Sequence, residues 1–234
     1  MCGIMLKHHG YTVTIIEKNT TQSRQSYDAG INIGPAVEEF LRKHDRVKRD
    51  FAITCPPGAA VNIHGESSLQ RGQTLVLTSW ALFVSILRAN FDGLCSKAVP
   101  NPPLALEGDG PAEFRTGAQV TDILEDDGKV LVTYKNVTHD TTGMMWADMV
   151  IVADGSTSSM REILMPEVKR EYLGYICWRG TVSEELIDRK WNEHYSGKAT
   201  LHFMNYHYLL KSAYRRIIIK EIDLTAPQLH YSIG

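Results

Sequence analysis

The sequence predicts an α/β protein whose first part alternates helices and strands and whose second part is mostly β-sheet. An apolar, β-branched run at 11–16 follows a short helical stretch and Gly10, an order typical of parallel α/β units. A second apolar run, at 149–153, leads into an acidic turn and another short helical stretch. Beyond Pro166 strand-like runs predominate, so we expect one domain over residues 1–166 and a second over residues 167–234.

The spacing of apolar residues predicts the order of the elements. Helical spacing predicts four helices in the first domain, at 2–9, 36–44, 79–94 and 159–164. Apolar and β-branched runs predict buried strands at 11–16 and 149–153, and two further strands around a turn at 61–64 and 74–77. A hairpin is expected from 118–124 and 130–134, joined by Asp126-Asp127-Gly128. In the second domain we expect a charged helix near 184–191 and strands at 172–182, 200–203 and 216–222.

The composition is that of an ordinary globular protein, with 43% hydrophobic and 22% charged residues among 234. A net charge of -2 gives no electrostatic case for binding nucleic acid. No apolar run approaches the length of a membrane span, and we expect no signal peptide. The four cysteines lack the spacing of a zinc or redox motif, so we expect no metal site and a cytoplasmic location.

The first candidate site residue is Glu17, which ends the apolar run at 11–16. In a dinucleotide-binding βαβ unit, an acid at the end of the second strand accepts hydrogen bonds from a ribose. Residues 10–17 match the latter half of such a Rossmann-like unit, whose glycine loop would come before Met1. The alternative is an ordinary α/β unit in which Glu17 is a solvated surface acid.

The second candidate site is the acidic turn at 154–161, between an apolar run and a short helix. Asp154 can accept hydrogen bonds from ribose hydroxyls, and Gly155 permits close approach of the backbone. Ser158 can cap the helix, while Arg161 can pair with a phosphate or lock the turn. The alternative is a strand–turn–helix in which Asp154 is only a structural cap.

Five stretches carry a family resemblance, in the family's order: 6–17, Asp28-Ala29-Gly30-Ile31, 78–93, 147–161 and Tyr175-Ile176-Cys177-Trp178-Arg179-Gly180. Over about residues 1–205 the chain resembles the FAD-dependent aromatic hydroxylases of the p-hydroxybenzoate hydroxylase type, and most closely the dihydroxypyridine and salicylate hydroxylase branch. The resemblance implies a Rossmann-like FAD-binding domain and a mostly β-sheet substrate domain. The family's glycine loop and its later Gly-Asp-Ala motif are not in the sequence, so we expect both domains to be incomplete and the chain to be truncated at both ends.

Position by position, the resemblance implies a cofactor site. Glu17 would bind the adenosine ribose of FAD, and Val120 would meet the adenine through its backbone. Asp154 and Gly155 would line the channel for the pyrophosphate and ribose. The full set is Glu17, Lys18, Arg24, Gly30, Val120, Asp154, Gly155, Ser158 and Arg161. No catalytic residue is assigned.

The implied activity is that of an FAD- and NAD(P)H-dependent monooxygenase acting on a small aromatic substrate and oxygen. In this family NAD(P)H reduces the flavin, and a flavin hydroperoxide then hydroxylates an electron-rich ring. One alternative is an inactive fragment or non-catalytic nucleotide-fold module derived from such an enzyme. Another is an FAD oxidoreductase with no hydroxylation step, which Trp178-Arg179-Gly180 argues against.

Overall fold

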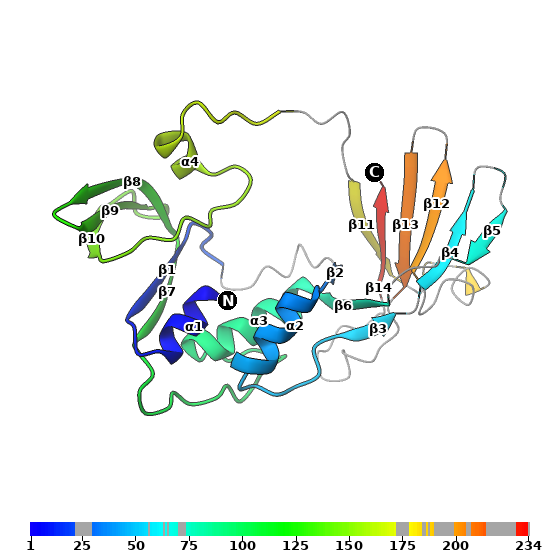
Figure 1. Ribbon diagram of the computed structural model, residues 1–234, viewed down its shortest axis with the longest axis horizontal. Coiled ribbons are helices and arrows are strands. Elements are labelled where there is room, and N and C mark those ends of the chain that lie inside the picture. Colours follow the sequence, from blue (N-terminus) through cyan, green and yellow to red (C-terminus); the bar gives the residue numbers. More distant parts are fainter. Residues whose placement is uncertain are drawn as a thin grey trace.

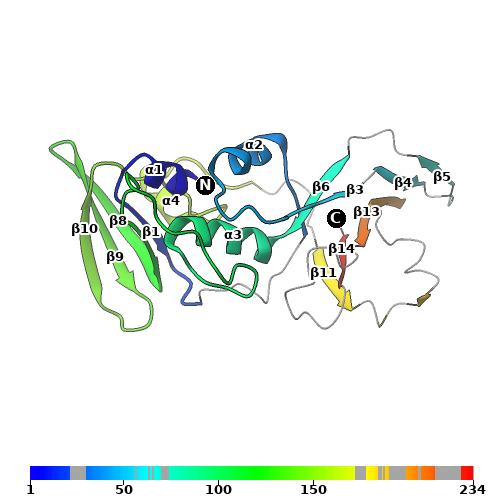
Figure 2. The same cartoon turned by 90° about the horizontal axis from the view of Figure 1, so that it is seen from below.

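In the computed structural model the three longest described helices lie in the middle, with sheets on either side of them (Figure 1). Figure 2 gives the same order from below, with α1, α2 and α3 between the β8–β10 strands and the β11–β14 strands. The described residues are 1–21, 30–55, 57–62, 64, 66–69, 74–171, 178–183, 186, 188–189, 199–204, 207–213 and 228–233.

The helices are α1 (Cys2–His8), α2 (Pro35–His44), α3 (Trp80–Asp92) and α4 (Ser159–Leu164). The strands are β1 (Val13–Glu17), β2 (Gly30–Asn32), β3 (Ile53–Cys55), β4 (Pro57–Val61), β5 (Ser67–Leu69), β6 (Leu75–Ser79), β7 (Ala112–Thr116), β8 (Ala118–Asp126), β9 (Lys129–Asn136), β10 (Thr142–Ala147), β11 (Trp178–Ser183), β12 (Ala199–Met204), β13 (His207–Ala213) and β14 (Gln228–Ile233). This mixture confirms the predicted α/β class.

The predicted parallel strand near the N-terminus is β1, which pairs in parallel with β7 so that Glu17 lies opposite Thr116. The helix α1 packs against β1 and against α3, and α3 also contacts β7. The prediction of a buried strand is wrong, because every residue of β1 is only half-buried. In the described part of the chain β7 is its one ladder partner, so burial is incomplete.

Helix α3 forms as its apolar spacing predicts. The Ser79 side chain caps it by accepting a hydrogen bond from the Leu82 backbone N–H at 3.1 Å. Gly93, with φ +70°, ends it in the left-handed conformation that glycine adopts without strain. Its buried side chains pack into two core clusters. The first consists of Leu82, Ile86, Ala89, Ala98 and Val99. The second joins Phe83 to Ile33 and to Leu41 of α2.

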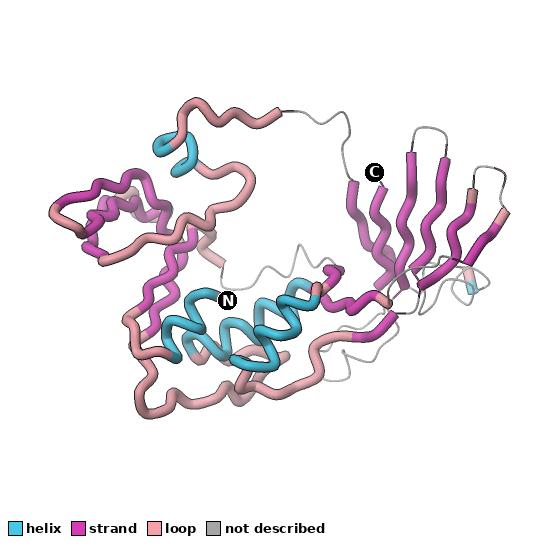
Figure 3. Tube along the Cα trace, in the orientation of Figure 1, coloured by secondary structure: helices cyan, strands magenta, loops and turns pink. Residues whose placement is uncertain are grey.

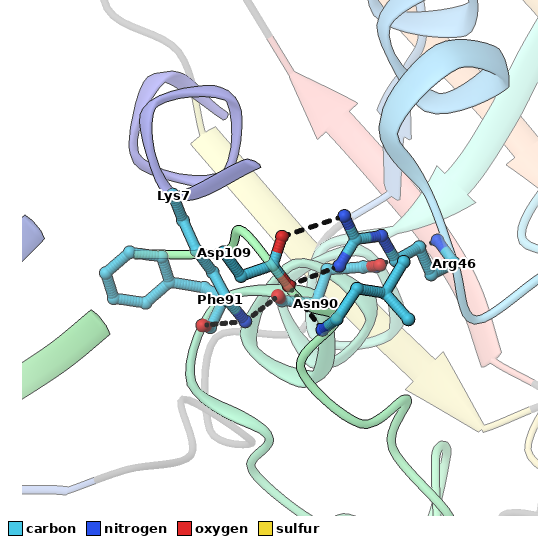
Figure 4. Close-up of polar contacts among 6 residues, drawn as sticks. Lys7, Arg46, Asn90, Phe91 and Asp109 are labelled. Atoms are coloured by element: carbon cyan, nitrogen blue, oxygen red, sulfur yellow. Dashed lines mark hydrogen bonds and ion pairs between the residues drawn. The ribbon is translucent and has the colours of Figure 1, made fainter. Parts of the chain in front are cut away.

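A buried lysine closes the C-terminal end of α3 (Figure 4). Lys7 Nζ donates to the backbone carbonyls of Asn90 at 3.0 Å and Phe91 at 2.8 Å, which lack partners within the helix. Beside it, the Arg46 guanidinium donates to both carboxylate oxygens of Asp109, at 2.5 and 2.9 Å. Because α1 leads through Gly10 into β1, these contacts also fix where β1 begins.

The strands predicted around a turn at 61–64 and 74–77 do not pair with each other. β4 pairs with β5 and β12, whereas β6 pairs with β2 and β3. The strand ends at Val61, and Asn62 closes a turn after it: its Oδ1 accepts from the backbone N–H of His64 at 3.0 Å and of Glu66 at 2.9 Å. The six-stranded sheet β11-β14-β13-β12-β4-β5 thus takes two strands from before residue 166, and the domain boundary stays a prediction.

The predicted hairpin is confirmed as β8 and β9, and β10 extends it to a three-stranded sheet. Asp127 and Gly128 form the turn with φ of +46° and +71°, as a two-residue hairpin turn requires. The predicted buried strand at 149–153 is wrong: the segment is irregular, and Met149, Ile151 and Val152 are 62%, 52% and 40% exposed. In the part of the chain described, no strand pairs with it.

The remaining predicted elements either are confirmed or lie, wholly or in part, outside the described residues. The strand at 200–203 is confirmed as β12, and the short helix at 159–164 as α4, which has loop on both sides in Figure 3. Residues 172–177, all of 216–222 and most of 184–191 lie outside the described residues. Within the described residues, no helix has both the length and the apolar character needed to span a membrane.

Candidate nucleotide-binding site

The acid predicted to bind a ribose stands at the end of β1. Glu17 is half-buried, and its Oε1 accepts hydrogen bonds from the backbone N–H of Asn19 at 2.9 Å and from Asn19 Nδ2 at 2.5 Å. The Asn19 carbonyl in turn accepts from the backbone N–H of Gly117 at 3.0 Å. The end of β1 is therefore tied to the corner between β7 and β8, with exposed Lys18 between the two bonded residues.

Val120 lies on β8 just after this corner. It is half-buried and stands opposite Tyr134 of β9. The register shifts between Val120 and Asp122, and the hydroxyl of Thr121 donates to the carbonyl of Thr133 at 3.2 Å. Such a bulge interrupts the regular ladder and redirects the backbone, and bulges are frequent next to binding sites.

The acidic turn precedes α4 and is held from within. Partial burial acts to raise the pKa of Asp154, but hydrogen bonds from the Ser158 side chain and from the backbone N–H of Met160 outweigh it and lower the pKa. The Met160 bond to Asp154 Oδ2 is long, at 3.4 Å. Gly155 has φ +86°, and a Cβ there would meet nothing within 4 Å, so the chain is open to close approach.

Two predicted contacts within this turn are confirmed. Ser158 is buried and caps α4, accepting from the backbone N–H of Arg161 at 2.9 Å. Arg161 locks the turn by donating from Nη2 to the carbonyl of Ser156 at 2.6 Å. The contacts of Asp154 match its alternative interpretation as a structural cap, while its role toward a nucleotide stays a prediction.

The structure brings some of the predicted site residues together and separates others. The strand β8, which holds Val120, contacts both β1, which ends in the acid, and α4, which follows the acidic turn. Gly30 is elsewhere, on β2 opposite Ser79, and Figure 1 places β2 across the helices from β1. Arg24 lies outside the described residues.

The sequence analysis did not identify Asn19 or Gly117. An asparagine two residues after a strand-ending acid is a local signal for a turn, but its bond to Gly117 joins segments far apart in the chain. Among the described residues, no group of three or more His, Cys, Asp or Glu side chains is placed to hold a metal ion.

No protein-family model matches the sequence, and no curated protein is similar to it. Solved structures do match. The chain aligns with 2,6-dihydroxypyridine-3-hydroxylase from Arthrobacter nicotinovorans at a TM-score of 0.71 and 18% identity, over 99% of this chain and 52% of that one. For the flavin-dependent monooxygenase PieE, solved with FAD and substrate, the TM-score is 0.62 at 12% identity, covering 99% and 40%. For p-nitrophenol 4-monooxygenase PnpA from Pseudomonas putida DLL-E4 it is 0.58 at 14% identity, covering 98% and 53%.

The chain therefore has the fold of part of the FAD-dependent aromatic hydroxylases, as the sequence resemblance predicts. It spans between 40% and 53% of the length of these three structures. At such identities the likeness extends to the fold alone.

Proposed function

We propose that the chain is part of an FAD- and NAD(P)H-dependent monooxygenase that hydroxylates an electron-rich aromatic ring. The observation that carries this proposal is that the bulged strand β8 contacts both the strand that ends in the acid and the helix that follows the locked acidic turn. The fold shared with flavin hydroxylases supports it. We propose residues 1–166 as the FAD-binding domain and 167–234 as part of the substrate domain, and we expect a cytoplasmic location.

The described residues are of the types, and at the positions, that suit binding of the adenosine end of FAD. Glu17 is a half-buried carboxylate at the end of a parallel strand, the residue type and position that accept hydrogen bonds from a ribose. The open face of Gly155 leaves room for the cofactor to approach the backbone. In our proposal Glu17 orients the ribose beside Lys18, Val120 lines the adenine, and the acidic turn with Ser158 and Arg161 borders the pyrophosphate. Arg24 and Gly30 stay proposed contacts.

Bound FAD would supply the redox chemistry, accepting hydride from NAD(P)H and activating oxygen toward the ring. The protein's share is to hold the cofactor and substrate in register and to exclude water. None of the described residues is assigned as a catalytic acid or base. The small aromatic substrate and oxygen are the proposed partners.

The test is an absorbance spectrum of the purified chain after incubation with FAD and gel filtration. The proposal predicts retained flavin, and NADPH oxidation that increases when 2,6-dihydroxypyridine or p-nitrophenol is added. Glu17→Gln should weaken FAD binding about tenfold, because it removes a charge-assisted hydrogen bond. The matched control is Glu125→Gln, an exposed acid on β8, which should bind FAD as the wild type does. A wild-type chain that retains no flavin would refute the proposal for this chain.

A non-catalytic nucleotide-fold module is the second candidate. The contacts of Asp154 and Arg161 favour it, since both side chains already stabilise their own turn. Such a module would bind FAD or ADP without any ring-stimulated oxidation of NADPH. The two candidates therefore differ in turnover, measured on the same flavin-loaded sample.

A further inference from the structure

Asn19 is the residue that connects the acid of β1 to the strand proposed to line the adenine. Both its backbone N–H and its side-chain Nδ2 donate to the same oxygen, Oε1 of Glu17. Its carbonyl accepts from the N–H of Gly117, and the Gly117 carbonyl accepts from the N–H of Val137 at 2.8 Å. Asn19 thus joins the end of β1 to the β7–β8 corner, and Gly117 joins that corner to the residue after β9.

These contacts fix the orientation of the Glu17 carboxylate, whereas the carboxylate of a solvated surface glutamate would rotate freely. A glutamate side chain rotates about three bonds, and ordering it for a ligand costs conformational entropy. Two N–H groups converging on one carboxylate oxygen select a single orientation before any ligand arrives. Bonds to an ionised acceptor are also stronger than neutral ones.

The corner that Asn19 contacts has a backbone conformation that favours glycine. Gly117 has φ +68°, in the left-handed region that other residues rarely adopt. It is buried and directly precedes β8, three residues before Val120. The distance from the acid to the bulged strand is therefore set through the Asn19–Gly117 bond.

We propose that Asn19 is a positioning residue that holds the Glu17 carboxylate in the orientation that recognises the ribose of an adenine nucleotide. This inference rests on the proposed nucleotide-binding function and adds a residue that no sequence motif identified. Asn19 touches Glu17 and the corner, and it acts on the ligand through them. Its loss should therefore reduce recognition of the ribose hydroxyl more than overall binding of the nucleotide.

The experiment is isothermal titration of the full chain with ADP and with 2′-deoxy-ADP. The wild type should bind ADP about tenfold more tightly, the value of one hydrogen bond to a charged group. Asn19→Ala keeps the backbone N–H but loses the Nδ2 bond, and the preference should fall to about twofold. Asn19→Ser, whose hydroxyl can still donate, should keep an intermediate preference. Thr20→Ala, a neighbour at the same corner, is the matched control and should retain the wild-type ratio.

The outcomes separate the positioning role from the function on which it rests. If the wild type shows the tenfold preference and Asn19→Ala shows it unchanged, the positioning role is overturned while the nucleotide site stands. If the wild type binds neither ADP nor FAD, the proposed function fails and the positioning role fails with it. Should Asn19→Ala not fold, Asn19→Asp decides: it keeps the side-chain size, removes the donor and should abolish the preference.

Discussion

At the residue scale, the partly buried ion pair of Asp109 and Arg46 gives the first prediction. The Asp109 side chain is 3% exposed, and both of its carboxylate oxygens accept hydrogen bonds from the Arg46 guanidinium. Asp109→Asn should lower the free energy of unfolding by about 3 kcal/mol at pH 7, because it leaves Arg46 without its charged partner. Urea denaturation measures this. Asp140→Asn is the control, since that acid pairs with Lys135 at an exposed site and should cost under about 0.5 kcal/mol.

The same pair makes stability depend on acid pH. Hydrogen bonds from Arg46 lower the pKa of Asp109 from 3.8 to about 2. The ionised carboxylate therefore contributes stability above pH 4, and this contribution, about 2 kcal/mol, is lost as pH falls toward 2. The stability difference between the wild type and Asp109→Asn should shrink over that window. A difference that stays constant from pH 5 to 2.5 would contradict this assignment.

A second residue-scale prediction concerns Gly110, which lies against the turn that leads into β1. A Cβ at Gly110 would be 2.0 Å from the Tyr11 carbonyl oxygen, a backbone atom that cannot rotate away. Gly110→Ala should therefore destabilise the chain by about 3 kcal/mol or more, seen as a lower midpoint of urea unfolding. Gly34→Ala provides the contrast: its Cβ would meet nothing within 4 Å, and we expect a loss near 0.5 kcal/mol at most.

At the scale of elements, α4 depends on its caps because it has only six residues. Ser158→Ala removes the acceptor for the Arg161 N–H and should destabilise this helix by about 1 kcal/mol. Hydrogen exchange at the Arg161 amide should then be about fivefold faster, with little change in exchange within α3. Ser156→Ala is the matched control, because only the backbone carbonyl of Ser156 bonds to Arg161. Equal exchange in both variants would argue against the capping role.

The same elements explain which parts of the fold the sequence could predict. The sequence predicts helix α3 over 79–94 and the helix spans 80–92, because Ser79 is a local start signal, Gly93 is a local stop signal and the apolar spacing is regular. The run at 149–153 has equally apolar residues, yet a strand forms only when another strand supplies the ladder. Local signals thus suffice for helices, while strands depend on distant segments.

The candidate site divides in the same way. The capping by Ser158 and the locking of the turn by Arg161 follow from residues within five positions of each other, and both were predictable. The role of Asn19 was not, because it depends on Gly117, which the fold brings beside it at the corner between β7 and β8. Nor could the bulge after Val120 be read from the sequence, since it arises from the pairing with β9.

At the scale of the whole molecule, exposed apolar side chains collect along one continuous stretch of chain. Met144 and Trp146 point outward from β10, and Met149, Ile151 and Val152 follow in the irregular segment. In the register of the sheet, Trp146 lies opposite Leu131, which lies opposite Leu124, so an apolar row crosses all three strands on one face. Contiguous apolar surface of this kind promotes association in water.

This surface predicts that the purified chain self-associates at micromolar concentrations and that one substitution reduces the association. Ile151→Lys places a charge in the middle of the exposed segment and should shift the sedimentation profile toward monomer. Its unfolding midpoint should hardly change, because the side chain is already half in water. Leu104→Lys, at an even more exposed leucine on a separate loop, tests whether any added charge suffices. If both variants dissolve the assemblies equally, net charge governs association; if only Ile151→Lys does, the exposed apolar segment that contains Ile151 is part of the contact surface.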